Sequence, residues 1–275
     1  MYPIDLMCRV LGVTRSGYYA WRTRPESQRL RHNRRLLAHI RAIHQASDQT
    51  YGSPRIWDEL TRGQGLPCGR HRVARLMRAH GIAAAQRPRY RVTTDSDHHR
   101  PVAPDRLERR FAVGGPNQVW VADITYIGTA EGWLYLAVVL DLFSRRVLGW
   151  ATAPRLGAEL ASRALQRAIL RRGRPAHLHH SDRGVEYASG AYQAILAAHG
   201  IQTSMTRPAD CWGNAVAESF FATLKTERVY RRYYRTRVDA HADLTQYIEQ
   251  WYNENRRHSS LDYDSPAEFE RRSVA

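Results

Sequence analysis

The hydrophobic pattern changes near residue 116, and the two sides of that change predict different architectures. Before it, over residues 33–81, apolar residues recur every three or four positions, which is typical of amphipathic helices. After it, short apolar runs alternate with helical segments, which predicts strands joined to helices. A chain of 275 residues is long enough for one or two domains that each bury a core.

Residues 33–81 are predicted to form three helices. Their inward-facing residues are Leu36, Leu37, Ile40 and Ile43 in the first helix, Ile56, Trp57 and Leu60 in the second, and Val73, Leu76 and Met77 in the third. The second helix begins at Ser53-Pro54, a favourable N-cap followed by proline in the first turn. Gly81 is placed to end the third helix in a left-handed conformation.

The third of these helices carries arginines that lie mostly off its apolar face: Arg70, Arg72, Arg75 and Arg78. Two short helices joined by a glycine-containing turn, with arginines on the second, are typical of a DNA-binding helix-turn-helix. The plain alternative is an amphipathic helix with a solvated basic face. We predict that residues 31–86 form a helix-turn-helix-like domain and that these four arginines contact DNA.

Two less regular segments flank this domain. Residues 1–30 are interpreted as a short basic helical segment, in which Leu11 to Trp21 combine apolar residues, a glycine turn and an aromatic cluster. Residues 87–112 are polar, contain three prolines and lack periodicity, which predicts a linker. His98-His99 has no partner ligands nearby in the sequence and is interpreted as linker polarity rather than as a metal pair.

Residues 113–275 show the order βββ-α-β-α-β-α-α. Strands are predicted at residues 119–126, 133–143, 147–152, 177–182 and 201–206, and helices at 158–172, 191–199, 214–230 and 239–253, followed by a basic loop and a short terminal helix. Three antiparallel strands followed by βα units predict a mixed five-stranded sheet with helices on both faces. The predicted fold class is therefore α/β, preceded by a small all-α domain.

The net charge of +16 indicates a polyanionic partner. Residues 1–110 hold 22 Arg against nine Asp and Glu, whereas residues 111–275 are nearly neutral at +3. A basic surface kept for solubility is the alternative, but this asymmetry favours nucleic acid. Three scattered cysteines without zinc spacing support neither disulfides nor a structural zinc. No signal peptide or membrane-spanning run is evident, so we expect a cytoplasmic protein with no membrane partner.

Three carboxylates carry the candidate chemistry: Asp123 within a strand, Asp182 at the end of the fourth strand, and Glu218 where a loop becomes a helix. A charged residue inside a strand is costly unless it is paired or binds a cation. Clustered carboxylates raise one another's pKa values, and a divalent cation relieves this. Oxygen ligands favour Mg²⁺, with Mn²⁺ able to substitute, and two ions roughly 3.5–4 Å apart suit phosphoryl transfer.

Each acid alone also has a structural reading. A strand-end Asp is often a turn cap, and Asp141 is interpreted in that way or as an accessory residue. Glu218 could simply favour a helix dipole. The order and spacing of the set favour the metal site, and Lys225 lies two turns from Glu218 on the same helix face.

Three motifs carry a family resemblance: Trp120–Tyr126, His180–Tyr187 and Asn214–Glu227. They resemble the signatures of insertion-sequence transposases of the DDE, retroviral-integrase-like superfamily. Tyr51–Ile56, Arg72–Met77 and the tail from Tyr252 to Glu268 are similar to the same group, so that the likeness covers about residues 6–270.

The resemblance implies a ribonuclease-H-like core in which Asp123, Asp182 and Glu218 bind metal and catalyse cleavage at element ends and strand transfer by a 3′-hydroxyl. It also implies that Lys225 contacts transposon-end DNA. Arg183 and Asn214, which lie inside the motifs, are further predicted DNA contacts.

The implied partners are the terminal inverted repeats, target DNA and further copies of the chain on DNA. In this group ribosomal frameshifting joins a first-frame product, which supplies a helix-turn-helix and a leucine zipper, to a second-frame product like this chain. The first-frame product is therefore a candidate partner or fusion, and we expect association with the nucleoid. Two alternatives remain: a DNA-binding regulator or inhibitor of transposition with an idle core, and a ribonuclease H, which the basic N-terminal half and Lys225 disfavour.

Overall fold

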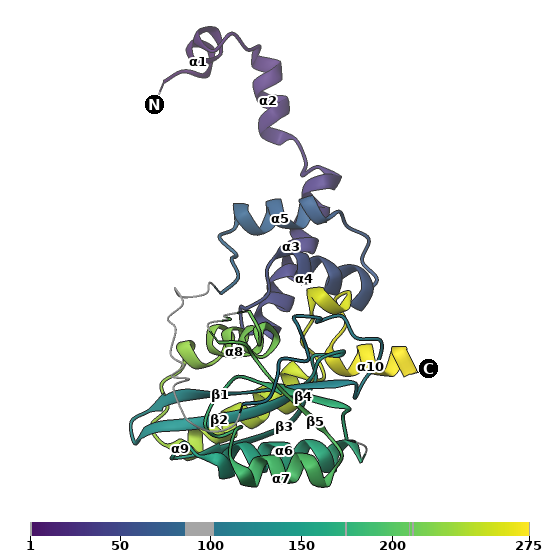
Figure 1. Ribbon diagram of the computed structural model, residues 1–275. Helices are drawn as coiled ribbons and strands as arrows, with labels where there is room; N and C mark the ends of the chain where they lie inside the picture. Colours follow the sequence, from purple (N-terminus) through teal and green to yellow (C-terminus); the bar gives the residue numbers. More distant parts are fainter. Residues whose placement is uncertain (1, 86–101, 174, 209, 211, 275) are drawn as a thin grey trace. The chain divides into compact units, whose positions relative to one another are not determined.

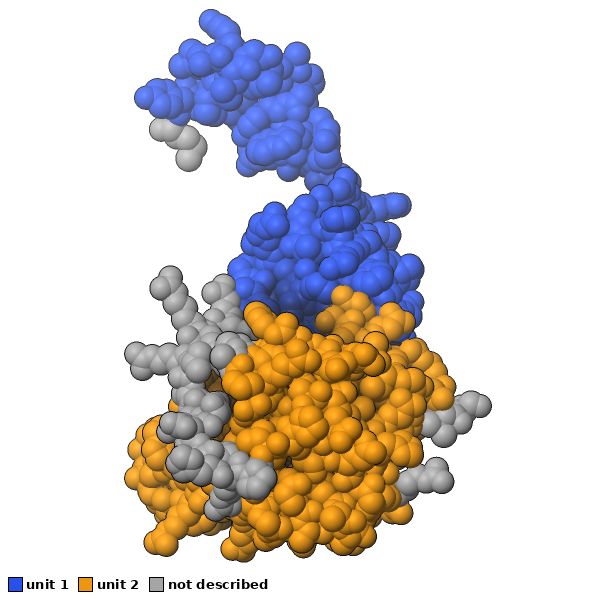
Figure 2. Space-filling view, viewed as in Figure 1, with its two compact units in different colours: residues 1–84 blue, residues 85–275 orange. Residues whose placement is uncertain are grey.

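The computed structural model in Figure 1 describes residues 2–85, 102–173, 175–208, 210 and 212–274. The chain divides into two compact units, residues 1–84 and residues 85–275, which Figure 2 distinguishes by colour. His98-His99, which we interpreted as linker residues, lies outside the described residues. Within the described ranges, no helix is long and apolar enough to span a membrane.

The first unit consists of helices. These are α1 (Ile4–Val10), α2 (Arg15–Thr23), α3 (Gln28–Ala46), α4 (Ser53–Asp58), a π-helical turn (Glu59–Gly63) and α5 (Arg70–Ala79). The three helices predicted between residues 33 and 81 are confirmed, with α3 beginning earlier because the Ser27 hydroxyl caps it at the N–H of Leu30. Gly81 adopts φ +66° after α5, as expected for a left-handed C-cap.

Apolar residues of α3, α4 and α5 form the core of this unit. Ile40, Ile56 and Val73 are fully buried. Trp57 is only half-buried, and its indole N–H donates to the Cys68 carbonyl at 2.9 Å. The α1–α2 segment contributes one buried side chain, Cys8, so the two short helices contain little core of their own.

The second unit is built on the predicted five-stranded mixed sheet. Its strands are β1 (Val119–Thr129), β2 (Gly132–Asp141), β3 (Val147–Ala153), β4 (Leu178–Ser181) and β5 (Gln202–Met205), in the spatial order β3-β2-β1-β4-β5. β1, β2 and β3 pair antiparallel, whereas β4 lies parallel to β1 and β5 lies parallel to β4. The predicted topology is therefore confirmed, and β1 is the central strand.

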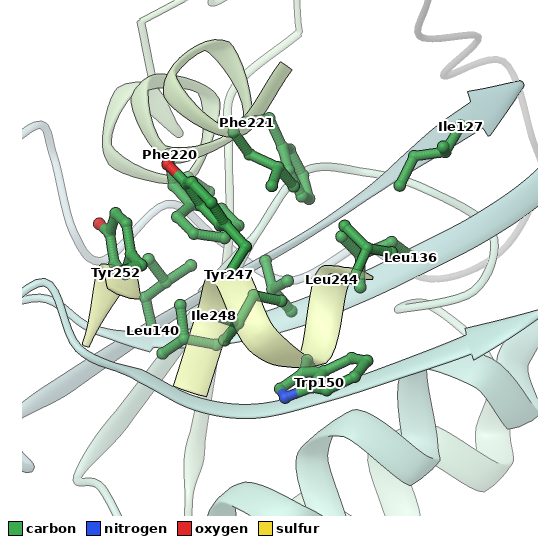
Figure 3. Packing of buried hydrophobic residues seen from close by; sticks show 14 of the residues in the cluster. Ile127, Leu136, Leu140, Trp150, Phe220, Phe221, Leu244, Tyr247, Ile248 and Tyr252 are labelled. Atoms are coloured by element: carbon green, nitrogen blue, oxygen red, sulfur yellow. The ribbon is translucent and has the colours of Figure 1, made fainter. Parts of the chain in front are cut away.

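Helices cover both faces of the sheet, as predicted. The described helices of this unit are α6 (Ala158–Arg172), α7 (Gly190–Ala198), α8 (Ala215–Glu227), α9 (Arg237–Thr245) with a π-helical continuation (Gln246–Tyr252), and α10 (Pro266–Val274), with short 3-10 turns at Val229–Arg231 and Ser259–Leu261. One core contains α6 and α7 side chains, and the other contains those of α8 and α9. Figure 3 shows Phe220, Phe221 and Leu244 packed over strand residues Leu136 and Leu140.

Close packing of α6 on the sheet depends on a glycine in β3. A Cβ atom on Gly149 would lie 2.4 Å from the amide nitrogen of Ala168 and would also collide with the carbonyl of Ala164. Any larger residue would push α6 away from β3. The sheet, and with it the carboxylates at its centre, is thereby held in a fixed position against this helix layer.

Two segments of the second unit differ from the sequence-based expectation. In the predicted linker, the described part from residue 102 onward packs on the core: Leu107 is buried, and the N–H of Arg106 donates to the Ser204 hydroxyl at 2.9 Å. The predicted basic loop after Tyr252 contains a buried arginine, Arg256. Both expectations rested on local polarity, whereas these contacts come from residues distant in the chain.

Asp141 is a turn cap, one of the two roles expected for it. Its carboxylate accepts the N–H groups of Asn117 at 2.7 Å, Phe143 at 2.9 Å and Ser144 at 3.2 Å. These bonds close the β2–β3 turn and tie it to the start of β1. The same carboxylate forms an ion pair with Arg172 of α6 at 3.6 Å, so Asp141 ties the turn to the helix layer as well.

His179 gives the fold a pH dependence. The ring is fully buried in β4 and bonds the Tyr192 hydroxyl at 2.8 Å. Burial, reinforced by neighbouring His180, lowers the pKa of His179 from 6.5 to about 3. The folded state therefore keeps His179 neutral where the unfolded chain protonates it.

We expect protonation of His179 in the unfolded chain to lower the free energy of unfolding by about 1.4 kcal/mol per pH unit as the pH falls from 6.5 towards 3. Above pH 6.5 His179 should have no such effect. Urea unfolding of the wild type and His179→Gln at pH 7, 6 and 5 measures the difference, because the variant keeps a polar group but cannot titrate. Parallel pH profiles for the two proteins would contradict the assignment.

Candidate active site

The strand register brings Asp123 and Asp182 together. β1 and β4 are parallel, and Ala122 pairs with Ser181 as the last pair of their ladder. Asp123 and Asp182 each follow one member of that pair, so they occupy equivalent positions on adjacent strands, where side chains leave on the same face. The first and fourth predicted strands are therefore neighbours in the sheet.

Asp123 lies in a cluster of negative charge. Burial raises its pKa well above the ordinary range, and the carboxylates of Asp182 and Glu218 raise it further. One carboxylate oxygen accepts the N–H of Ile124 at 2.8 Å, which partly opposes this effect. A carboxylate in these surroundings is stabilised by a nearby cation.

Asp182 is followed by a tight turn that brings a fourth acid close. The N–H of Gly184 donates to Oδ1 of Asp182 at 2.9 Å. A Cβ atom on Gly184 would lie 3.0 Å from both Asp182 Oδ1 and Glu186 Oε2, so only glycine fits easily between the two carboxylates. Glu186 was not singled out in the sequence; its place two residues after an Asp-Arg-Gly turn was the available signal.

Glu218 is held beside β1 by the start of α8. It lies in the first turn of the helix, and its N–H donates to the Asn214 carbonyl at 3.1 Å. The side-chain amide of Asn214 donates in turn to the carbonyl of Ala122 at 2.9 Å. Asn214 is 4% exposed. Its hydrogen bond to Ala122 therefore joins the start of α8 to β1, the strand that carries Asp123. Burial and the charges of Asp182 and Asp210 raise the pKa of Glu218.

Lys225 faces the same cluster from α8. Its ammonium lies 4.9 Å from the centre of the Tyr126 ring on β1. Burial lowers the pKa of Lys225, while the charge of Asp123 opposes that shift. The single lysine of the chain is therefore placed next to the acidic cluster, partly desolvated and close to the surface.

The predicted DNA contacts fall into two groups. Arg70, Arg75 and Arg78 are exposed on α5, whereas Arg72 is half-buried and donates from Nε to Asn33 on α3 at 2.9 Å. Arg183 donates from Nε to the Thr206 carbonyl at 2.7 Å and so links the ends of β4 and β5. The three exposed arginines are accessible to phosphate among the described residues, while Arg72, Arg183 and Asn214 have structural contacts.

The carboxylate oxygens of Asp123, Asp182 and Glu218 suit a hard divalent cation, because the negative charges of neighbouring carboxylates raise the pKa values of Asp123 and Glu218. Across the part of the chain that the structure describes, no three His, Cys, Asp or Glu side chains are already arranged as a closed set of metal ligands. Asp123 and Asp182 are fixed by strand register, and Glu218 is the member that a flexible side chain can bring toward them.

The five-stranded mixed sheet is that of an integrase core, and with the transposase relatives it identifies a polynucleotidyl transferase of the DDE type. Residues 114–211 and 199–266 match families described as "Integrase core domain", and residues 31–90 match "HTH-like domain". The chain belongs to the insertion-sequence transposases that carry this integrase core.

Curated relatives match along the whole chain. The transposase InsF for insertion sequence IS3A of Escherichia coli (strain K12) is 43% identical over 278 residues, covering 100% of this chain and 96% of that protein. The insertion element IS600 31 kDa protein of Shigella sonnei is 42% identical over 264 residues, covering 96% of this chain and 97% of that protein. A chain of the simian T-cell lymphotropic virus intasome shares the fold, with 17% identity, a TM-score of 0.50 and coverage of 84% of this chain and 74% of that chain.

Proposed function

We propose that this transposase cleaves at the ends of its insertion sequence and joins the resulting 3′-hydroxyl to target DNA, using Asp123, Asp182 and Glu218 to hold divalent metal. The observation that supports the proposal is the matched position of Asp123 and Asp182 on parallel strands, with Glu218 close enough to raise the pKa of Asp123. Mg²⁺ is the expected cofactor, as two ions, with Mn²⁺ able to substitute.

Bound as a pair, such ions activate an attacking oxygen and stabilise the leaving oxygen of a phosphodiester. The chain's own residues supply the framework for this chemistry. Asp123 and Asp182 come from strands and therefore keep a fixed spacing, while Glu218 completes the set from α8. Lys225 places a positive charge next to them, where it holds a DNA phosphate against the acidic cluster.

Asn214 acts in this proposal as a positioning residue rather than a DNA contact. The hydrogen bond from its side-chain amide to the Ala122 carbonyl fixes the start of α8, one turn before Glu218, to β1. Asn214→Ala should lower the rate of strand joining by about 10- to 100-fold, as supporting residues of metal sites typically do.

DNA affinity should stay within about twofold of the wild type in Asn214→Ala, because the side chain is buried. Joining rates and DNA affinity of the variant, measured side by side, separate the two roles. A fall in affinity with an unchanged rate at saturating protein would instead identify Asn214 as a DNA contact.

DNA binding is assigned to the basic first unit. Arg70, Arg75 and Arg78 project from α5, and we propose that they contact the terminal inverted repeats. Arg72 contributes by orienting α5 through Asn33. Several copies of the chain assemble on DNA in this proposal, the first-frame product is a fusion or partner, and the protein works in the cytoplasm at the nucleoid.

A joining assay tests the function. The full chain is mixed with a duplex that ends in the terminal repeat, a supercoiled target and Mg²⁺. Joined products that disappear with EDTA are expected. Tight, metal-independent binding without joining would favour the alternative, a regulator with an idle core. Cleavage of an RNA–DNA hybrid in preference to the DNA end would indicate a ribonuclease H.

A further inference from the structure

Residues 4–23 form a helix pair with the geometry of a helix-turn-helix, outside residues 31–90 that match the HTH-like family. α1 is followed by a four-residue turn, Leu11 to Thr14, and then by α2. Figure 1 shows the pair at the N-terminal end of the chain. A turn of three or four residues that contains glycine is characteristic of this motif.

The turn is held at both ends by its own residues. Gly12 adopts φ +64°, its N–H donates to the Arg9 carbonyl at 3.3 Å, and the N–H of Val13 donates to the Cys8 carbonyl at 3.0 Å. These two bonds form a Schellman C-cap on α1. The Thr14 hydroxyl then accepts the N–H of Gly17 at 3.0 Å and so caps α2.

Side-chain contacts also hold α1 and α2 together. Cys8 of α1 is buried, with 4% of its surface exposed. Asp5 of α1 forms an ion pair with Arg15 of α2 at 2.8 Å. The angle between α1 and α2 is thus set by the turn, by a small buried side chain and by an ion pair, rather than by a large core.

No residue of α2 is buried, and one of its exposed faces has the chemistry of a DNA-reading surface. The Ser16 hydroxyl there bonds the Thr14 hydroxyl at 3.2 Å, and the Thr23 hydroxyl donates to the Tyr19 carbonyl at 2.8 Å. Ser16, Ala20 and Thr23 lie four and three residues apart and share this face, with Tyr19 beside them, and all four are exposed. Arg22 lies on its flank. Small, hydroxyl and aromatic side chains can contact base edges, while flanking arginines contact phosphates.

We propose that residues 4–23 form a second DNA-reading module, with α2 as its recognition helix in the major groove. The segment carries four Arg and one Asp over residues 1–24, which suits a polyanion. An α-helix with its side chains is about 10–12 Å across, which fits a major groove roughly 12 Å wide. This inference goes beyond the proposed function, because it adds a stretch of duplex that the 31–90 domain does not read.

Ser16→Glu is the variant that tests the module. Ser16 lies in the first turn of α2, where an acidic residue stabilises the helix, so a loss of binding cannot be attributed to unfolding of α2. Gln28→Glu is the matched control: it adds the same charge to the first turn of α3, outside the proposed face. Both full-length proteins are titrated against a labelled duplex of the element's end in EDTA.

We expect Ser16→Glu to weaken binding at least about tenfold and Gln28→Glu by less than about twofold. A hydroxyl-radical footprint should shorten at one end in Ser16→Glu and keep the protection made by the 31–90 domain. Equal effects of the two variants with an unchanged footprint would overturn the proposal. A change of oligomeric state in Ser16→Glu with an unchanged footprint would also overturn the proposal, because it would show that α1 and α2 contact protein rather than DNA.

The test is separate from the test of strand transfer. It uses no metal, so its failure leaves the assignment of Asp123, Asp182 and Glu218 unaffected. Conversely, an inactive core would leave the expected footprint difference intact.

Discussion

Asp182→Asn should reduce strand joining by at least about a thousandfold while leaving DNA binding intact. Loss of one carboxylate ligand removes several kcal/mol of transition-state stabilisation by metal, and each 1.36 kcal/mol is a factor of about ten in rate. The substitution keeps the size of the side chain and its bond to the N–H of Gly184. Joining of a precleaved terminal duplex in Mg²⁺ measures the effect.

DNA affinity provides the internal control for this variant. Asp182→Asn removes a negative charge next to the expected path of DNA, so affinity should be unchanged or slightly higher. Glu159→Gln is the matched substitution, because Glu159 is an exposed acid in the first turn of α6, in the layer opposite α8. Joining by Glu159→Gln should equal that of the wild type. If Asp182→Asn also joined DNA at the wild-type rate, the proposed metal site would be wrong.

Arg256→Met should destabilise the second unit by about 3–5 kcal/mol. Arg256 is 3% exposed and forms two bonds to Glu227 at the end of α8, from Nε at 2.8 Å and from Nη2 at 2.6 Å. The Tyr247 hydroxyl donates to the same carboxylate at 2.9 Å. Removal of the arginine leaves Glu227 charged and buried, which is the costly outcome.

Denaturant unfolding measures the effect of Arg256→Met, with Arg271→Met as control. Arg271 pairs with Glu254 at 3.5 Å on the surface, so its loss should cost less than about 1 kcal/mol. The double variant Glu227→Leu, Arg256→Met should lose about 1–3 kcal/mol less stability than the sum of the losses in the two single variants. Additive costs would mean that the two side chains do not depend on one another.

The contact of Arg256 with Glu227 and the contact of Asn214 with Ala122 hold the same helix. α8 is held at its start by Asn214 on Ala122 and at its end by Glu227 on Arg256, with Glu218 between them. Its apolar side packs Phe220 and Phe221 into the sheet (Figure 3). Glu218, the glutamate that we propose binds metal, therefore comes from a helix that is fixed at both ends, which is what a reproducible carboxylate geometry requires.

The sheet could be predicted from the sequence because its strands are short apolar runs separated by recognisable turns. The sequence places Asp123 and Asp182 at strand positions, where they can converge if the first and fourth strands are neighbours. The structure shows that these strands pair in parallel, with Ala122 opposite Ser181. The pattern of α5 similarly predicted its buried and exposed sides, with Val73 buried and Arg75 exposed.

The remaining features depend on contacts between residues far apart in the chain. Arg256 was interpreted as part of a basic loop, because its partner Glu227 lies 29 residues earlier. Leu107 was placed in a linker, although its backbone bonds the Ser204 side chain across 97 residues. The sequence motif predicts a DNA contact for Asn214, whereas the contact of its amide with the Ala122 carbonyl joins residues 92 positions apart and cannot be predicted from the motif.

The α1–α2 pair was underestimated for a different reason. Two short helices that bury only Cys8 produce almost no apolar periodicity. The sequence therefore shows only a glycine turn and an aromatic cluster in this segment. The decisive features are conformational: the positive φ of Gly12 and the capping bond of Thr14. Such features are determined by backbone geometry, which the sequence indicates only weakly.

The central claim is that Asp123, Asp182 and Glu218 hold the same metal, and cleavage of the chain by bound iron tests it directly. Fe²⁺ replaces Mg²⁺ at oxygen-ligand sites and, with ascorbate and peroxide, cuts backbone close to the ion. We expect cuts near residues 123, 182 and 218, all suppressed by excess Mg²⁺ and lost together in Asp182→Asn. Cuts at only one of the three positions, or cuts that Asp182→Asn does not remove, would contradict it.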